Sequence, residues 1–251
     1  REHRATPLRL EGSQFAGATS IALADLDRDG RLDWITGGVA GARLYSADES
    51  GVAGREGALL CASSVRSLRV ADFDGDGAID VALGCEGRAQ PTHYFARGRG
   101  DFAAVEGGLV DVPMHGSPGG RAGGDFDRDG REDLLLGSTT GAATVLWSAT
   151  RDGQLEVLAS FSAGFTHAVA SMDLERDGDL DVITADAQPA AGQPCVRTWV
   201  QAEDGSFSQA AAFAEGAASA LAVADVDADG RAELWIGFLD RAMELWSPTA
   251  A

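Results

Sequence analysis

One acidic run of nine residues recurs five times along the chain, and it constrains the fold more than any other feature. The runs read DLDRDGRLD (25–33), DFDGDGAID (72–80), DFDRDGRED (125–133), DLERDGDLD (173–181) and DVDADGRAE (225–233). Their starts lie 47, 53, 48 and 52 residues apart. A period near 50 residues predicts an array built from one supersecondary unit.

Short segments with the pattern of β-strands flank each run. A segment such as SIALA or ALAVA precedes it, and an apolar segment such as WITGG or LWIGF follows it. A third segment carries an aromatic residue, and a turn then leads to a fourth segment such as LEVLASF. Amphipathic helical periodicity is absent over any useful length. Four short strands per unit, separated by turn signals, are typical of a propeller blade.

The two ends of the chain predict how the blades close into a ring. The fifth unit has three strands before PTAA, whereas residues 5–12 offer a spare strand before the first unit. We expect this N-terminal strand to complete the last blade, which leaves no open sheet edge. The strand before each run has mostly Ala, Ser or Gly on one face, with Arg69 and Met172 as exceptions. A narrow axis needs such small side chains, so the sequence predicts a single all-β domain (1–251), a five-bladed β-propeller with four-stranded blades.

The spacing within the runs predicts metal ligation. Carboxylates occupy positions 1, 3, 5 and 9, and Gly at position 6 permits a sharp turn. These oxygens, with a backbone carbonyl at position 7, suit Ca²⁺, which takes six to eight oxygen ligands in flexible geometry. Zn²⁺ prefers His or Cys, and the runs contain neither. An EF-hand is excluded because position 12 carries Thr, Leu or Ile where that motif needs Glu.

The predicted ligands are therefore the residues at positions 1, 3, 5, 7 and 9 of each run. They are Asp25, Asp27, Asp29, Arg31, Asp33, Asp72, Asp74, Asp76, Ala78, Asp80, Asp125, Asp127, Asp129, Arg131, Asp133, Asp173, Glu175, Asp177, Asp179, Asp181, Asp225, Asp227, Asp229, Arg231 and Glu233. Glu175 and Glu233 stand where the other runs have Asp, and we expect weaker binding there. The alternative is an acidic turn without metal. Against it, 20 of the 39 acidic residues lie at the carboxylate positions of the runs and would repel one another strongly without a cation.

Charge and composition exclude several classes of function. The formal net charge is −19, which about five Ca²⁺ ions would bring to −9, so binding to a nucleic-acid backbone is not expected. No stretch of the sequence is long and apolar enough to predict a membrane span. The chain contains no lysine and none of the common nucleophile, zinc-protease or phosphate-loop motifs. We therefore expect no enzymatic activity.

The runs, the apolar strands that end near Gly, and hairpins such as LWSATRDGQLEVLASF resemble FG-GAP/VCBS repeats. These repeats are the calcium-binding blades of integrin α-subunit-like propellers and of many secreted bacterial proteins. The resemblance covers essentially the whole chain. It implies that the runs bind Ca²⁺ between the first and second strands of each blade. Because those propellers commonly have more and longer blades, no ligand site is transferred from them.

Ligand-binding candidates come from two loops that are longer than their counterparts, CEGRAQPTHY and ADAQPAAGQPC. We expect them on the face opposite the acidic runs, where propellers usually present ligands. The candidate residues are Arg88, Gln90, His93, Tyr94 and Gln193.

Two further sets of residues are interpreted structurally. One aromatic residue recurs per unit, and we expect this set in the core between blades rather than as a platform for sugars. Its members are Tyr45, Phe95, Trp147, Trp199 and Trp246. The third cysteine, Cys195, leaves an odd count that excludes a disulfide scaffold, while a single bridge between Cys61 and Cys85 stays open.

These observations favour a monomeric, secreted or cell-surface bacterial protein. It would be a calcium-stabilised propeller that binds carbohydrate or protein ligands, like a lectin or an adhesion module. Two alternatives stay open: a purely structural or designed repeat domain without a ligand of its own, and a glycan-active enzyme. The ligand, any further domains and the cysteine state are not fixed by the sequence.

Overall fold

The computed structural model describes residues 17–47, 55–85, 92–96, 102–104, 118–139, 141–150 and 155–247. Within these ranges the chain forms strands, turns and bends but no helix. Consequently, the described part of the chain contains no helix that could cross a membrane. The strands are β1 (Ala18–Ala24), β2 (Asp33–Gly38), β3 (Gly41–Ser46), β4 (Arg55–Cys61), β5 (Val65–Ala71), β6 (Asp80–Cys85), β7 (Thr92–Ala96), β8 (Phe102–Ala104), β9 (Pro118–Gly124), β10 (Asp133–Ser138), β11 (Ala143–Ala149), β12 (Leu155–Ala163), β13 (Thr166–Met172), β14 (Asp181–Asp186), β15 (Val196–Gln201), β16 (Phe207–Phe213), β17 (Ala218–Ala224), β18 (Glu233–Phe238) and β19 (Glu244–Trp246).

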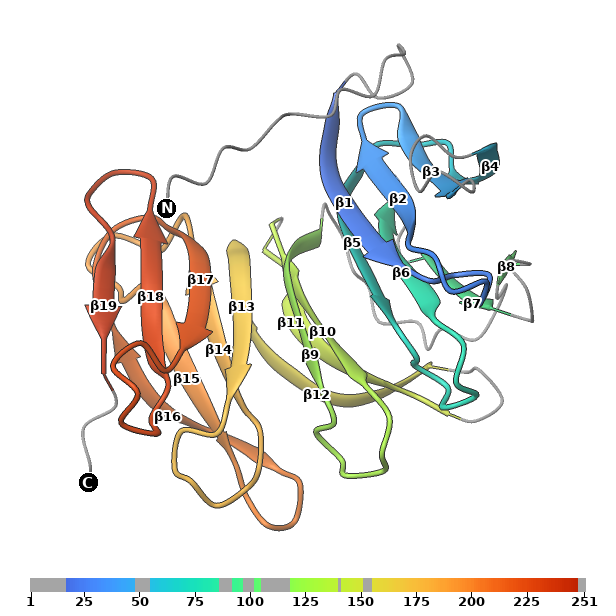
Figure 1. Cartoon of the computed structure of the whole chain (residues 1–251). Coiled ribbons are helices and arrows are strands. Elements are labelled where there is room, and N and C mark those ends of the chain that lie inside the picture. Colours follow the sequence, from blue (N-terminus) through green and yellow to red (C-terminus); the bar gives the residue numbers. More distant parts are fainter. Residues whose placement is uncertain are drawn as a thin grey trace, which may run out of the picture.

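Each sequence repeat folds as an antiparallel sheet of its own (Figure 1). Sheets 1 to 4 contain β1–β4, β5–β8, β9–β12 and β13–β16, and sheet 5 contains β17–β19. In every sheet, the acidic run joins the first strand to the second. We call these runs loops 1 to 5. The predictions of an all-β fold and of four-stranded units are confirmed, while the strand expected at residues 5–12 lies outside the described residues.

The sheets follow one another along an arc, with their first strands on its inner side (Figure 1). β1 packs beside β5, β5 beside β9, β9 beside β13, and β13 beside β17. Sheets 1 and 5 lie at the two ends of the arc (Figure 1). Because neighbouring first strands pack side by side, the loops that follow them gather on one side of the molecule.

Adjacent sheets share one repeated apolar contact. Position 2 of a loop belongs to the same apolar cluster as position 8 of the next loop. The pairs are Leu26 with Ile79, Phe126 with Leu180, and Leu174 with Ala232. Burying apolar area contributes roughly 25 cal/mol per Å², so these clusters stabilise the packing of adjacent sheets.

The strand register corrects one member of the aromatic set. The residues that face the second strand at the equivalent position are Tyr45, Tyr94, Trp147, Trp199 and Trp246. Tyr94 therefore replaces Phe95, because a shift of one residue along a strand moves a side chain to the other face. Tyr45 and Trp147 are buried as expected, whereas Trp246, on sheet 5, is 38% exposed.

Arg69, a large residue where most first strands carry Ala, Ser or Gly, has a partner in the next repeat. Its Nε donates to Oε1 of Glu132 at 2.8 Å, and its Nη2 contacts the same oxygen. Glu132 is itself an exception, because position 8 of the other four loops carries an apolar residue. A Cβ on Gly123 would lie within 2.7 Å of both side chains, so the glycine leaves room for this pair. Sheets 2 and 3 are thus joined by an ion pair where other sheets use an apolar contact.

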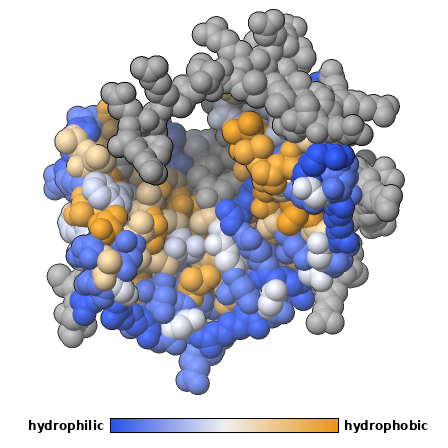
Figure 2. All heavy atoms as spheres, in the orientation of Figure 1, coloured by the Kyte–Doolittle hydropathy of each residue, from blue (hydrophilic) through white to orange (hydrophobic). Residues whose placement is uncertain are grey.

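The two ends of the arc expose the side chains that are covered in the other interfaces. At the sheet 1 end, Ile21, Leu23 and Leu32 are 62%, 57% and 60% exposed. At the sheet 5 end, Val226 is 51% exposed. Figure 2 shows hydrophobic surface over both ends, and a hydrophilic rim along the side of the loops. Val226 occupies position 2 and Leu32 position 8, the positions that share an apolar cluster at three of the four interfaces between described sheets.

The two cysteines whose side chains the structure describes differ in state. Cys61, at the end of β4, is disulfide-bonded. Cys195 is buried and free. The side chain of Cys85 lies outside the described ones.

A double-mutant cycle measures the ion pair between sheets 2 and 3. Glu132→Leu alone leaves the half-buried guanidinium of Arg69 unpaired, so the free energy of unfolding should fall by about 1 kcal/mol. When Arg69 is already replaced by Ala, Glu132→Leu should lower the free energy of unfolding by a smaller amount. The difference between the two backgrounds should be at least about 0.5 kcal/mol. Urea denaturation provides the values. Additive effects of the two substitutions would show that the pair contributes nothing to cohesion.

Candidate functional site

One hydrogen bond closes all five loops in the same way. The backbone N–H of position 2 donates to the carboxylate of position 9 at 2.6–3.0 Å. The pairs are Leu26 with Asp33, Phe73 with Asp80, Phe126 with Asp133, Leu174 with Asp181, and Val226 with Glu233. These five acidic residues are at most 3% exposed. Glu233 makes the bond through Oε2, so the longer side chain preserves it.

The remaining carboxylates also accept backbone hydrogen bonds. In every loop the N–H of the position 6 glycine donates to position 1 at 2.8–3.0 Å. The N–H of position 7 donates to position 5 at 2.6–3.0 Å. These glycines have φ between +82° and +91°, as predicted for a sharp turn. Each loop is therefore wound around its own acidic side chains.

Position 4 was not singled out from the sequence, yet it is left-handed in every loop. Its residues are Arg28, Gly75, Arg128, Arg176 and Ala228, with φ between +59° and +75°. The three arginines reach the following loop. Arg28 and Arg176 donate to the backbone carbonyls of Asp76 (3.5 Å) and Gly230 (2.6 Å), and Arg128 pairs with Asp179. The signal was an arginine in three of the five loops, but its target could not be read from the sequence.

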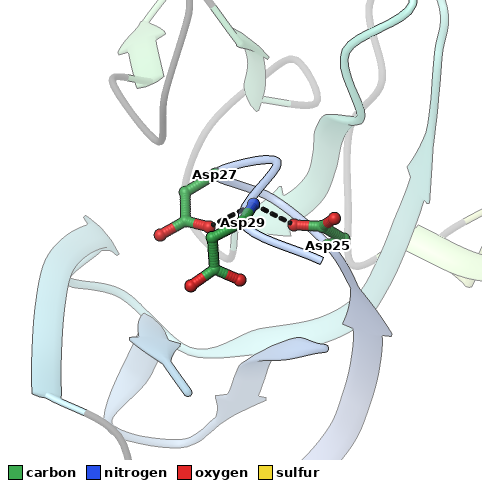
Figure 3. A group of neighbouring side chains, drawn as sticks. All are labelled: Asp25, Asp27 and Asp29. Carbon is green, nitrogen blue, oxygen red and sulfur yellow. Dashed lines mark hydrogen bonds between the residues drawn. The ribbon is translucent and has the colours of Figure 1, made fainter. Parts of the chain in front are cut away.

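Carboxylate oxygens converge in four of the five loops. In loops 1 and 5, one oxygen from each of positions 1, 3 and 5 lies within 4.8 Å of the others. In loops 2 and 3, positions 1, 3 and 9 form the group. Figure 3 shows Asp25 and Asp27 on either side of the backbone nitrogen of Asp29, which donates to both at 3.0 and 3.2 Å. Among the described residues, loop 4, which carries Glu175, has no such group.

Burial works against the charge of these carboxylates. It raises the pKa of Asp133 to about 6, although the hydroxyl of Ser148 and the N–H of Phe126 partly offset it. Burial, followed by the charges of Asp33 and Asp29, also raises the pKa of Asp27. Burial is likewise the main cause that raises the pKa of Asp74. Loops 1 to 3 therefore gather negative charge where a nearby cation would relieve this cost.

Two of the loops place a guanidinium beside this charge. Arg31 pairs with Asp29, and Arg131 pairs with Asp129, in both cases from position 7 to position 5. In these two loops, position 7 is predicted to supply a backbone carbonyl to the metal. Its arginine side chain also places a positive charge beside the carboxylates. Loop 2 carries Ala78 at position 7, and the guanidinium that pairs with its Asp76 comes from Arg28 of loop 1, at 3.8 Å.

The donor set fits a hard divalent cation. It consists of carboxylates that are oriented by backbone N–H groups and still have oxygen lone pairs available. Ca²⁺ accepts six to eight such oxygens in flexible geometry. Positions 1 and 3 are best placed to hold it, because they belong to all four convergent groups. Position 9 has a second role, since its carboxylate also closes the loop.

The predicted ligand residue Gln193 lies at the opposite end of the strands, in the connection between β14 and β15. With Gln188, Glu215 and Asp240, it lines a pocket of about 370 Å³, which we call the Gln193 pocket. Of the other candidates, Arg88 and Gln90 lie outside the described residues, as do the side chains of His93 and Tyr94 on β7.

Backbone bonds hold the base of this connection. The N–H of Asp186 donates to the carbonyl of Cys195 at 2.7 Å, and the N–H of Cys195 donates to that of Ala214 at 3.0 Å. Below it, the buried carboxylate of Asp186 pairs with Arg197 at 2.7 Å. The sequence does not indicate this ion pair, because Asp186 and Arg197 are brought together only by the pairing of β14 with β15. These hydrogen bonds and the ion pair therefore hold in place the connection that carries the Gln193 pocket.

Known structures resemble the fold. BBS1N, solved in complex with ARL6DN and soaked with lead, aligns with a TM-score of 0.59 and 12% identity, covering 94% of this chain and 67% of that one. Its mercury-soaked counterpart gives 0.57 and 12%, covering 93% and 66%. An Agrocybe aegerita lectin that recognises non-reducing terminal N-acetylglucosamine gives 0.55 and 19%, covering 93% and 67%. At these identities the likeness concerns the fold, and the chain spans about two thirds of their length.

The repeats themselves identify the family. No curated protein matches the chain. The FG-GAP-like repeat profile, however, matches residues 72–136, 125–184 and 173–236, each match running from one acidic loop through the next. Because these matches together span 72–236, well over half of the sequence, the chain belongs to the FG-GAP-like repeat family.

Proposed function

We propose that this protein is a calcium-stabilised, five-bladed β-propeller that works outside the cell as a binding module for a carbohydrate or protein ligand. The observation that carries the proposal is the repeated loop geometry. Five loops turn their acidic residues inward with the same backbone hydrogen bonds, and four of them bring three carboxylates within 4.8 Å of one another. Without a cation, that arrangement is electrostatically unfavourable.

Each Ca²⁺ would stabilise the start of a blade. The loop joins the first two strands, so an ion held by positions 1 and 3 fixes the hairpin that begins the blade. If Ca²⁺ binds the folded state and not the unfolded state, each site adds about 2.7 kcal/mol to the free energy of unfolding when the free Ca²⁺ concentration is a hundred times the dissociation constant. Loop 4 would bind most weakly, because its carboxylates do not form a convergent group among the described residues.

Closure into a ring explains the exposed ends of the arc. Val226 and Leu32 hold the loop positions that meet at three of the four interfaces between described sheets, so sheet 5 and sheet 1 present complementary apolar faces. Contact between them would complete a ring of five blades, with residues 5–12 as the fourth strand of sheet 5. The competing arrangement is a longer protein in which further blades cover these faces.

The Gln193 pocket is the candidate ligand site. Its polar side chains are two amides and two carboxylates, which suit a ligand rich in hydroxyl or amide groups, and alanine, glycine and proline residues form the rest of its lining. The two fold neighbours illustrate both ligand classes, since one was solved with a protein and the other recognises a sugar. The amides and carboxylates of this pocket, held on a hydrogen-bonded connection, favour a carbohydrate ligand over a protein. We assign no catalytic chemistry to the pocket.

Two features support an extracellular setting. Exposed carboxylate loops of this kind suit the millimolar Ca²⁺ found outside cells. In addition, Cys61 is disulfide-bonded, and disulfides persist mainly in oxidising compartments.

Removal of calcium tests the role of the loops. Excess EGTA should lower the melting temperature by at least about 10 °C, because the gathered carboxylates lose their counter-charge. Asp74→Asn should lower the melting temperature with Ca²⁺ but not in EGTA, since Asn keeps the hydrogen bond to Asp76. Glu215→Gln, which removes the same charge far from the loops, is the matched control. Differential scanning calorimetry that gives the same melt with and without EGTA would contradict the proposal.

Cross-linking tests the ring. In a Leu32→Cys, Val226→Cys variant, a short bis-maleimide should join the two thiols within one molecule, because both side chains would lie in the closing interface. Each single variant serves as a control. Mass spectrometry after digestion identifies the linked peptides. Exclusively intermolecular products would mean that the two faces cover another copy rather than each other.

Glycan-array binding tests the ligand site. The calcium-loaded protein should bind a subset of glycans, and Gln193→Ala and Asp240→Asn should each reduce the signal about tenfold, as expected for losing hydrogen bonds to a ligand. Glu156→Gln, an exposed change on β12, should leave the signal intact. A signal that survives both pocket substitutions would place the ligand elsewhere.

A further inference from the structure

A second pocket lies on the side of the molecule that carries the loops, between sheets 3 and 4. It has a volume of about 390 Å³, and we call it the Gln201 pocket. Phe126, Phe207 and Leu158 form an apolar wall, and Leu158 is 39% exposed. The rings of Phe126 and Phe207 lie 6.3 Å apart between centroids, in a tilted contact. The wall is therefore suited to hydrocarbon or to a flat group.

Gln201 departs from the repeat. At the equivalent position, two residues after the aromatic residue of the third strand, repeats 1 to 3 carry alanine: Ala47, Ala96 and Ala149. The fold thus needs only a small side chain here, together with the backbone N–H that donates to Asp181 at 2.9 Å. Because alanine suffices at this position in repeats 1 to 3, the fold of the blade does not need the side-chain amide of Gln201.

That amide presents an unused acceptor. Gln201 is 7% exposed, and its Nε2 donates to the carbonyl of Phe126 at 2.9 Å, which fixes the orientation of the amide. Its Oε1 is buried and has no hydrogen-bond partner among the described residues. A buried acceptor without a donor is costly and rare in folded proteins. A ligand with N–H groups in the pocket would satisfy it.

The rim of the pocket is acidic. Glu203 and Asp204 are exposed on the turn between β15 and β16. The cation on this rim, Arg128, is already paired with Asp179 from loop 4. Asp204 accepts two hydrogen bonds from Ser206 through Oδ1, which leaves Oδ2 for a ligand. With a net charge of −19 over the whole chain, the rim favours a cation.

We propose that the Gln201 pocket receives the side chain of an arginine from a basic segment of a partner protein. The methylene stem would pack on the apolar wall, and the guanidinium would donate to Oε1 of Gln201 and to the carboxylates of the rim. A guanidinium offers five N–H donors in a rigid planar fork that stacks on aromatic rings, whereas a lysine ammonium is a compact charge with three donors. This inference goes beyond the proposed function, because it assigns a second site on the opposite face from the Gln193 pocket.

Peptide binding tests the inference. The probe is a fluorescein-labelled peptide of Gly, Ser and two Arg residues, titrated by fluorescence anisotropy into the calcium-loaded full chain. Parallel peptides carry citrulline, a neutral isostere, or Lys in place of Arg. The arginine peptide should bind at least about tenfold more tightly than the citrulline peptide and more tightly than the lysine peptide. Equal affinity for any two of these peptides would overturn the proposal.

Variants separate the pocket from the general negative charge. Gln201→Ala restores the residue of the other repeats and should weaken binding of the arginine peptide about tenfold. Glu203→Gln changes an exposed turn residue, which leaves the core untouched, and should weaken binding about threefold. Glu244→Gln removes the same charge from β19 of sheet 5, outside both pockets, and should have no effect. Unchanged affinity in Gln201→Ala, or equal losses in the two glutamate variants, would contradict the assignment.

Discussion

The hydrogen bond between the position 9 carboxylate and the position 2 backbone N–H underlies the architecture of every repeat. It spans 2.6–3.0 Å in all five loops and closes each loop at the start of the second strand. In Asp133 and Asp181, burial raises the pKa of this carboxylate, and the hydrogen bond offsets that effect only in part. Under the proposed function, a bound cation would stabilise loops closed by acidic residues, which links the fold to its proposed calcium dependence.

Cohesion between repeats depends on the same loops. Residues at positions 2 and 8 carry the contact from one sheet to the next, and position 4 arginines extend from one loop to its successor. A change in one loop consequently affects the adjoining interface as well as its own hairpin. Sheets 2 and 3 depart from this rule, because Arg69 and Glu132 form an ion pair there.

Much of the fold could be predicted from the sequence, because a period near 50 residues and an invariant glycine are visible without a structure. The loops, their glycines and the three or four strands per unit follow from that pattern. Other features depend on pairing in space. The choice of Tyr94 over Phe95 requires the strand register. The left-handed arginines and the unused acceptor of Gln201 were equally hidden, since an Arg or Gln in one repeat resembles ordinary variation until its surroundings are known.

The central claim is that the acidic loops hold calcium and thereby hold the blades. A crystal structure of the calcium-loaded protein, with anomalous diffraction data at a long X-ray wavelength, tests it most directly. The account predicts an anomalous peak in each loop with three convergent carboxylates, coordinated by positions 1 and 3. Loops that keep their backbone hydrogen bonds but contain no anomalous peak would contradict it, because the carboxylates would then act only as turn-closing groups.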